Sequence, residues 1–169
     1  MEVIIVTGTP GTGKTTLSKN LAKRLNFFYL DVGKLISKNK LSEGYDKKRK
    51  TKIVDVDKLR KILISKIKIF QNENNKKKFP RRKFFGIIID SHLSHYLPKK
   101  HVDLCIVAKC DIKELSKRLK KKRFHKEKIK ENIQSEIFGI CHNEALERKH
   151  KVIVIDTSKT ELKKFNFLS

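Results

Sequence analysis

The stretch VIIVTGTPGTGKTT, Val3 to Thr16, places a run of aliphatic residues directly before three glycines, a lysine and two threonines. Gly8, Gly13, Lys14 and Thr15 fit the spacing Gly-x-x-x-x-Gly-Lys-Thr of a phosphate-binding loop. Glycines let backbone N–H groups turn toward an anion without a Cβ in the way. Lys14 can then reach the β- and γ-phosphates of a nucleotide, and the Thr15 hydroxyl can ligate Mg²⁺.

The residues around this loop decide between a phosphate loop and a plain Gly/Thr-rich turn. EVIIV has the continuous apolar character of a buried parallel strand, and the segment after the loop repeats Leu17, Leu21 and Leu25 at helical spacing. A helix that begins there offers the positive end of its dipole to an anion. This strand–loop–helix context favours the phosphate loop.

Strand and helix patterns alternate along the rest of the chain. Because such alternation is typical of a parallel sheet with helices on both faces, we predict an α/β fold in a single domain, 1–169, with a five-stranded parallel sheet. After the first strand, strands are expected at 27–30, 84–90, 102–108 and 151–156; helices are expected at 15–25, 55–70 and 112–124, with one long helix at 126–149. A short helix or loop is expected at 31–40, a polar basic segment at 45–52, a loop at 71–83 and a short helix in the tail, 159–169.

A second chemical feature stands at the end of the strand expected at 84–90. Asp90 closes that strand, and His92 follows two residues later. A carboxylate there can hold a water on the same Mg²⁺ that Thr15 contacts. His92 is interpreted as a residue that orients an attacking water or contacts the γ-phosphate, with a structural loop histidine as the alternative. His92 and His95 also resemble a metal-binding pair, although no third ligand has the expected spacing.

The charge balance limits the possible partners. Lys and Arg number 42 against 18 Asp and Glu, for a formal net charge of +24. Such a charge attracts polyanions such as nucleic acid, a ribosome or an anionic membrane; the alternative is a lysine-rich proteome. Three cysteines without a Cys-x-x-Cys pair are typical of reduced thiols inside a cell. With no signal peptide pattern and no apolar run of membrane-spanning length, a cytoplasmic protein is expected.

Several stretches taken together resemble one family. TGTPGTGKTTLSKNLA, LDVGKL, EGYDKK, IVDVDKL, IIIDSHLSHYLP and KENIQSEIF occur in the order found in the adenylate kinase isoenzyme six family, over roughly residues 2–156. The phosphate loop alone would suit many kinases, whereas Asp-x-His after the strand with NIQSEIF later is more specific. That family is a nucleotide kinase and ATPase that assists maturation of the small ribosomal subunit.

The resemblance implies roles for particular residues. It implies ATP binding by the loop residues Gly11, Gly13, Lys14, Thr15 and Thr16. It implies a nucleoside-monophosphate flap at 31–54 and a short lid at 122–132. Asp90 and His92 match the family's Asp-x-His, which is linked to Mg²⁺ and ATP hydrolysis. The turn near Lys159 and Thr160 resembles the place where the adenine ring lies.

The chain departs from the family pattern in the lid and in the flap. The family lid begins Arg-Gly-aromatic, but here it reads Lys122-Arg123-Phe124. Either Lys122 replaces the phosphate-binding arginine, or Arg123 does so one residue later; a guanidinium can grip two phosphate oxygens, which favours Arg123. In the flap, Ser37 and Lys38 stand where an arginine or other polar group is common. The loop 71–83 is long for the family.

The sequence therefore predicts a nucleoside-monophosphate kinase that prefers AMP and also has Mg²⁺-dependent ATPase activity. The resemblance adds small-subunit ribosomal protein eleven and pre-ribosomal RNA as partners, with no membrane. One alternative is an assembly factor whose kinase turnover is incidental. Another is a small-molecule kinase on the same scaffold, as in shikimate-type kinases.

Overall fold

The centre of the molecule is a five-stranded parallel sheet. The computed structural model describes residues 1–46, 51–75 and 84–158. Within them the sheet has the order β2-β5-β1-β6-β7. Its strands are β1 (Glu2–Thr7), β2 (Phe28–Asp31), β5 (Gly86–Asp90), β6 (Leu104–Lys109) and β7 (Val152–Asp156). All four pairings are parallel, so the five strands end at the same edge of the sheet. The predicted five-stranded parallel sheet is confirmed.

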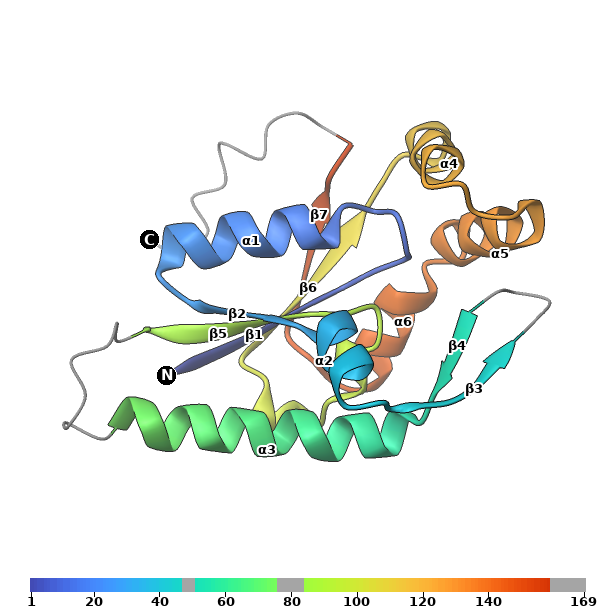
Figure 1. The fold of residues 1–169 in the computed structure, drawn as a ribbon. Coiled ribbons are helices and arrows are strands. Elements are labelled where there is room, and N and C mark those ends of the chain that lie inside the picture. The colour runs from blue at the N-terminus through green and yellow to red at the C-terminus, as the bar shows by residue number, and fades with distance from the viewer. Residues whose placement is uncertain (47–50, 76–83, 159–169) are drawn as a thin grey trace.

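Helices cover both faces of the sheet (Figure 1). On one face α1 (Lys14–Leu25) packs Leu17, Leu21 and Ala22 against the strands. On the other face α3 (Val56–Asn75) contributes Leu59, Leu63 and Ile67, and α6 (Ile140–Glu147) contributes Ala145. Because both faces are covered, the interior positions of the middle strands are a continuous apolar run, with polar residues only at the strand ends. The burial of the core positions follows the strand and helix periodicities of the sequence.

The remaining helices gather beyond the strand ends. Figure 1 shows α4 (Ile112–Lys121) and α5 (Lys126–Ile137) as neighbours at one side of the molecule, next to α6. Helix α2 (Val32–Lys38) follows β2 directly and is capped by Asp31, whose carboxylate accepts from the Lys34 backbone N–H at 3.0 Å. Two short 3-10 helices, η1 (Ser94–Tyr96) and η2 (Lys99–His101), connect β5 to β6.

The predicted long helix at 126–149 is wrong in one respect. The chain breaks it at Gly139, which has φ 60° and is the N-cap of α6. A left-handed residue cannot continue a right-handed helix, and glycine adopts that conformation without the Cβ clash. The break separates α5, which packs against α4, from α6, which packs under the sheet.

The sequence analysis assigned no strand to the polar basic segment at 45–52, but strands reach into it at both ends. A two-stranded antiparallel sheet joins β3 (Ser42–Asp46) and β4 (Thr51–Val54). Few apolar residues alternate with polar ones in these strands, so the two-residue periodicity was too weak to predict them.

Helix α3 also extends to Asn75, into the loop predicted at 71–83. The expected tail helix at 159–169 lies outside the described residues.

Candidate active site

The phosphate loop lies where the sequence places it, between the end of β1 and the start of α1. Gly11 and Gly13 have φ 98° and 87°, which an L-residue rarely adopts. Gly13 is the N-cap of α1, makes no side-chain cap, and no acidic side chain stands in the first turn. The first N–H groups of α1 therefore have no partner within the helix, and they form an anion-binding end with a favourable dipole.

Helix α4 and the end of β7 support this loop from behind. A Cβ on Gly11 would come within 2.8 Å of Leu119 Cδ2 and 2.9 Å of Leu115 Cδ1, so the loop backbone lies directly on α4. The Thr157 hydroxyl donates to the Thr12 carbonyl. The Arg118 guanidinium donates to Thr157 Oγ1 at 3.2 Å and to the Thr157 carbonyl at 3.1 Å. These contacts fix the loop relative to the sheet.

Lys14 is a half-buried residue whose ammonium is enclosed by the protein. Its ammonium donates to the Thr9 carbonyl at 2.9 Å, within the loop itself. Burial lowers the pKa of Lys14 from 10.5 to about 8, an effect partly opposed by Cys141 and by the Asp90 carboxylate. A buried ammonium that is only partly compensated gains from an anion placed beside it. Bound phosphate groups would supply that negative charge.

Asp90 and Thr15 meet at one tyrosine. Asp90 ends β5, beside Val6 of β1 and Asp31 of β2, and only 6% of its surface is exposed. The Tyr29 hydroxyl donates to Asp90 Oδ2 at 2.9 Å, and the Thr15 side chain also acts on the phenol as a hydrogen-bonding group. Burial, followed by the hydrogen bond to Asp90, raises the pKa of the Tyr29 phenol well above 10.0.

These residues fit a magnesium ion. A carboxylate and a hydroxyl are hard oxygen ligands, and Mg²⁺ in nucleotide sites is held by one or two carboxylates together with phosphates. The described residues contain no cluster of three or more His, Cys, Asp or Glu side chains that could hold a metal by themselves. Such an arrangement is expected of an ion that enters with its nucleotide.

The two histidines after β5 have separate environments. His95 is 1% exposed, and its ring nitrogens lie 2.7 Å from Thr7 Oγ1 and 2.7 Å from Glu144 Oε2. Both nitrogens are therefore occupied, and the structure does not support the metal-binding pair with His92. Desolvation, and then the charge of Lys14, lowers the pKa of His92. The side chain is exposed, and a lowered pKa favours the neutral imidazole, which can accept a hydrogen bond.

The predicted lid, 122–132, covers the turn after α4 and the first half of α5. Lys122 is the C-cap of α4, and its positive charge contributes to lowering the pKa of Lys14. Arg123 has φ 56°, the left-handed conformation for which the family's Arg-Gly-aromatic pattern supplies a glycine. The charge of Lys128, on α5, contributes to lowering the pKa of His92. The Lys128 ammonium lies over the Phe124 ring, 4.7 Å from its centroid. Of Lys122 and Arg123, Lys122 is the one whose charge acts on the pKa of Lys14.

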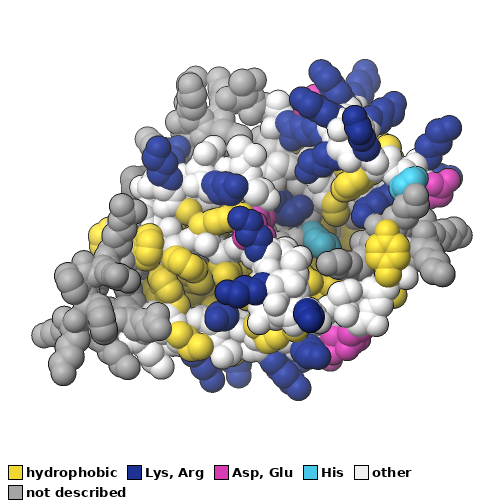
Figure 2. Space-filling model, in the orientation of Figure 1, with side chains coloured by type: hydrophobic (Ala, Val, Ile, Leu, Met, Phe, Trp, Pro, Cys, Tyr) yellow, Lys and Arg dark blue, Asp and Glu magenta, His cyan; other side chains and the backbone are white. Residues whose placement is uncertain are grey.

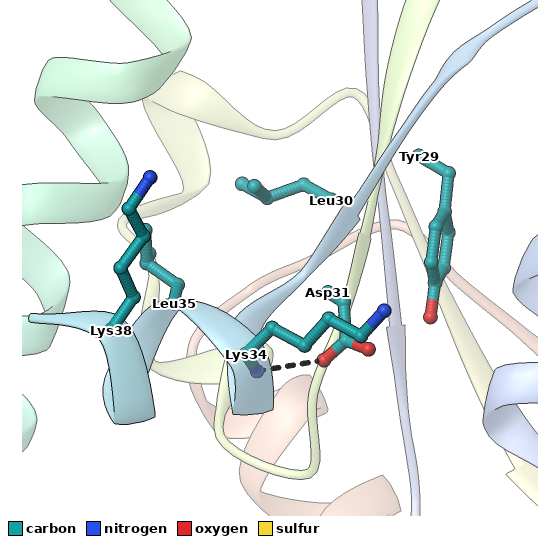
Figure 3. Close-up of a pocket in the computed structure, with 6 residues that line it drawn as sticks. All are labelled: Tyr29, Leu30, Asp31, Lys34, Leu35 and Lys38. Atoms are coloured by element: carbon teal, nitrogen blue, oxygen red, sulfur yellow. Dashed lines mark hydrogen bonds between the residues drawn. The ribbon is translucent and has the colours of Figure 1, made fainter.

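Two regions named from the sequence flank the site. Helix α2 and the end of β2 enclose a pocket of about 290 Å³, lined by Tyr29, Leu30, Asp31, Lys34, Leu35 and Lys38. Figure 3 shows the Lys34 side chain extending near Asp31 and Tyr29, with Lys38 on the far side of Leu35. Lys159 and Thr160, expected near the adenine ring, lie outside the described residues.

Sequence reasoning missed three residues that border the site. Tyr29 carries no motif, but it stands two positions before the end of β2, next to the strand that ends in Asp90. Arg118 and Lys128 belong to the cation-rich segment 117–130, where the sequence alone does not separate inward from outward cations. Their helical positions were the available signal, since Arg118 lies one turn after the buried Leu115 and Lys128 lies one turn before the buried Asn132.

The fold and this loop define the class of protein: a P-loop nucleotide-binding domain of the kinase type. A protein-family model described as an AAA domain matches residues 4–139. A solved sugar kinase from Janibacter shares the fold at a TM-score of 0.58 with 18% identity, over 98% of this chain and 87% of its own.

Curated relatives give the family. An "Adenylate kinase isoenzyme 6 homolog" of Caenorhabditis elegans is 32% identical over 151 residues, covering 89% of this chain and 76% of the relative. A "Putative adenylate kinase" of Methanocaldococcus jannaschii is 35% identical over 159 residues, covering 94% and 78%. The chain belongs to the adenylate kinase isoenzyme 6 family, and it is a kinase-like P-loop protein. In the part of the chain that the structure describes, no helix is long and apolar enough to cross a membrane.

Proposed function

We propose that the protein is a nucleoside-monophosphate kinase that transfers the γ-phosphoryl group of ATP to AMP, giving two ADP, and that it hydrolyses ATP when water is the acceptor. The observation that carries this proposal is the Lys14 ammonium at the head of α1, enclosed by the protein and within electrostatic reach of Asp90 and His92. Phosphoryl transfer needs mainly alignment and positive charge on the phosphate oxygens, and this site offers both.

Each residue has a defined part in this reaction. The N–H groups of the loop bind the β-phosphate, and Lys14 binds the β- and γ-phosphates. Thr15 and Asp90 hold Mg²⁺, which neutralises charge that develops on the transferred group. Lys122 places a second cation opposite Lys14, on the lid side. Closure of the flap, 31–54, and the lid, 122–132, excludes water from the transferred group.

The adenine ring is proposed to lie beside Arg118 and the turn at 156–158. Arg118 already bridges α4 and that turn through Thr157, and its flat guanidinium can stack on a base. Lys159 and Thr160 continue the same turn in the sequence. Arg118→Ala should therefore raise the KM for ATP more than it lowers kcat.

His92 is proposed to select between the two acceptors. Its imidazole can accept a hydrogen bond from a water molecule and orient it, a role needed only when water replaces the monophosphate. The same site then serves transfer and hydrolysis. Solved kinases with this fold show that the scaffold also suits other acceptors, so the acceptor must be determined by experiment.

The direct test is product analysis over a panel of monophosphates. ATP is incubated with the protein alone and with AMP, dAMP, CMP or UMP, and ADP is measured by coupled detection. ADP formation that depends on AMP supports the kinase; ATP loss without an acceptor supports the ATPase. Lys23→Ala, on the exposed side of α1, serves as the control for Lys14→Ala. Failure of every monophosphate to increase ADP formation would contradict the kinase assignment.

We further propose that the protein works in the cytoplasm on small-subunit maturation, with ribosomal protein eleven and pre-ribosomal RNA as partners. Support comes from the surface of α4 and α5: Figure 2 shows Lys and Arg side chains crowded where Figure 1 places these helices. Exposed lysines line α4 at positions 113, 117, 120 and 121. A nucleotide needs few cations, so this excess fits a phosphate backbone. The basic segments 47–50 and 76–83 lie outside the described residues.

RNA binding is tested by its salt dependence. Single-stranded RNA binding weakens with a log–log slope of about 0.7 per phosphate contacted. Changing the four α4 lysines to Gln should reduce that slope while leaving AMP phosphorylation intact. Changing four exposed lysines of α3 (58, 61, 66 and 68) is the matched control. If the wild-type protein shows no salt-dependent affinity for RNA, the RNA part of the proposal is wrong.

The protein partner is tested separately by measuring ATPase activity with and without ribosomal protein eleven. Stimulation of the ATPase would favour an assembly factor over a metabolic kinase.

A further inference from the structure

We propose that Tyr29 is a positioning residue, which holds Asp90 and Thr15 in the arrangement that receives the Mg²⁺ of the bound nucleotide. The inference rests on the proposed function, because it concerns the same metal–nucleotide site. Tyr29 touches neither nucleotide nor metal in this account; it acts through the two side chains it joins.

The geometry places the phenol between the two candidate ligands. Tyr29 lies on the edge strand β2 and pairs with Ile88 of β5, two residues before Asp90. Its hydroxyl donates to Asp90 Oδ2 at 2.9 Å, and the Thr15 side chain acts on the same phenol. Thr15 comes from α1 and Asp90 from β5, so one side chain connects ligands from two elements far apart in sequence.

The rest of the ring is held independently of this hydroxyl. The ring packs against the core cluster on the α1 face of the sheet, and the Lys19 ammonium lies 5.8 Å from its centroid. A phenylalanine at position 29 would keep these contacts and lose only the hydrogen bonds of the hydroxyl. The substitution Tyr29→Phe therefore separates positioning from packing.

A hydrogen bond to one oxygen of Asp90 has two physical effects. It stabilises a carboxylate that is only 6% exposed, where lost hydration is otherwise costly. It also fixes the orientation of the carboxylate, leaving the other oxygen to the ion or to a water on it. Outer partners of this kind contribute about 10- to 100-fold to metal affinity or activity in known metal sites.

The experiment measures how much Mg²⁺ strengthens ADP binding. Calorimetric titrations of ADP with Mg²⁺ and with EDTA give a metal-dependent ratio of dissociation constants for each variant. Wild type should bind ADP more tightly with Mg²⁺, and Tyr29→Phe should reduce the ratio by about tenfold while ADP affinity in EDTA is unchanged. Tyr96→Phe is the matched control: it removes a hydroxyl bonded to Glu144, away from Asp90 and Thr15, and should leave the ratio unchanged.

A double-mutant cycle shows whether Tyr29 acts through Asp90. In an Asp90→Asn background, Tyr29→Phe should have little further effect on the ratio. Equal ratios for wild type and Tyr29→Phe would overturn this inference and leave the proposed kinase standing. A wild-type ratio of one would contradict Mg²⁺-dependent nucleotide binding itself, and the inference with it. A reduced ADP affinity in EDTA for Tyr29→Phe, with an unchanged ratio, would assign Tyr29 to packing alone.

Discussion

The phosphate loop, residues 8–16, and the α4–α5 turn, residues 122–125, both bring cations to one site, but they are held in different ways. Lys14 is half-buried and hydrogen-bonded to the Thr9 carbonyl five residues away, so local geometry fixes its place. Lys122 is exposed at the end of α4 and reaches the site only because α4 packs against the loop. A cation fixed by its own loop can be assigned from spacing, whereas one carried by a helix end depends on how that helix packs.

The largest effect is expected at the locally fixed cation. Lys14→Ala should lower kcat/KM for both AMP phosphorylation and ATP hydrolysis by at least about 100-fold, because a charge clamp on the transferred group is lost. Circular dichroism should show an unchanged fold. Turnover close to wild type would mean that Lys14 does not take part in the reaction. It would contradict the idea that a cation fixed by its own loop can be assigned from spacing.

The second prediction concerns the cation carried by the helix end. Lys122→Ala should lower kcat/KM for AMP phosphorylation by roughly 10- to 100-fold, since its charge faces Lys14. Arg123→Ala should cost less, because Arg123 occupies the left-handed turn position. Steady-state kinetics of the two variants decide the order. The reverse order would show that the guanidinium turns toward the phosphates and that the chemistry of the side chain outweighs its position.

The third prediction separates hydrolysis from transfer. His92→Ala should lower ATP hydrolysis by about tenfold or more and affect AMP phosphorylation less, because only a water acceptor needs orientation or a base. ADP release is followed with and without AMP. If the two activities fall by the same factor, His92 supports the site structurally or through the metal, and does not select the acceptor.

The smallest effect concerns stability at the turn. Arg123→Gly should stabilise the fold by about 1 kcal/mol, because glycine removes the Cβ strain at φ 56°. For a domain of this size that corresponds to a rise in melting temperature of about 2–4 °C. Arg123→Ala keeps the Cβ and should show no comparable gain. An equal change in both variants would point to the loss of charge in a basic segment as the cause.

Much of the fold followed from patterns that act over short distances. The apolar runs at 84–90 and 102–108 predicted the strands β5 and β6, and the helical spacing of leucines predicted α1. Each of these patterns is specific to the backbone geometry of a buried strand or of a helix. The break at Gly139 was missed, since the apolar pattern continues across it and a single glycine inside a helix is ambiguous. The β3–β4 hairpin was missed because its strands are polar and pack little against the core.

The sequence by itself determined the phosphate loop, its lysine and the aspartate that ends β5, because spacing within a loop and position at a strand end are local properties. It also identified the family through the order of its motifs. Only the tertiary structure decided which cations act on Lys14, that His95 is bound by Thr7 and Glu144, and that Tyr29 joins Thr15 to Asp90. These contacts join residues up to 88 positions apart. They depend on how helices and strands pack, and no short-range pattern in the sequence encodes that packing.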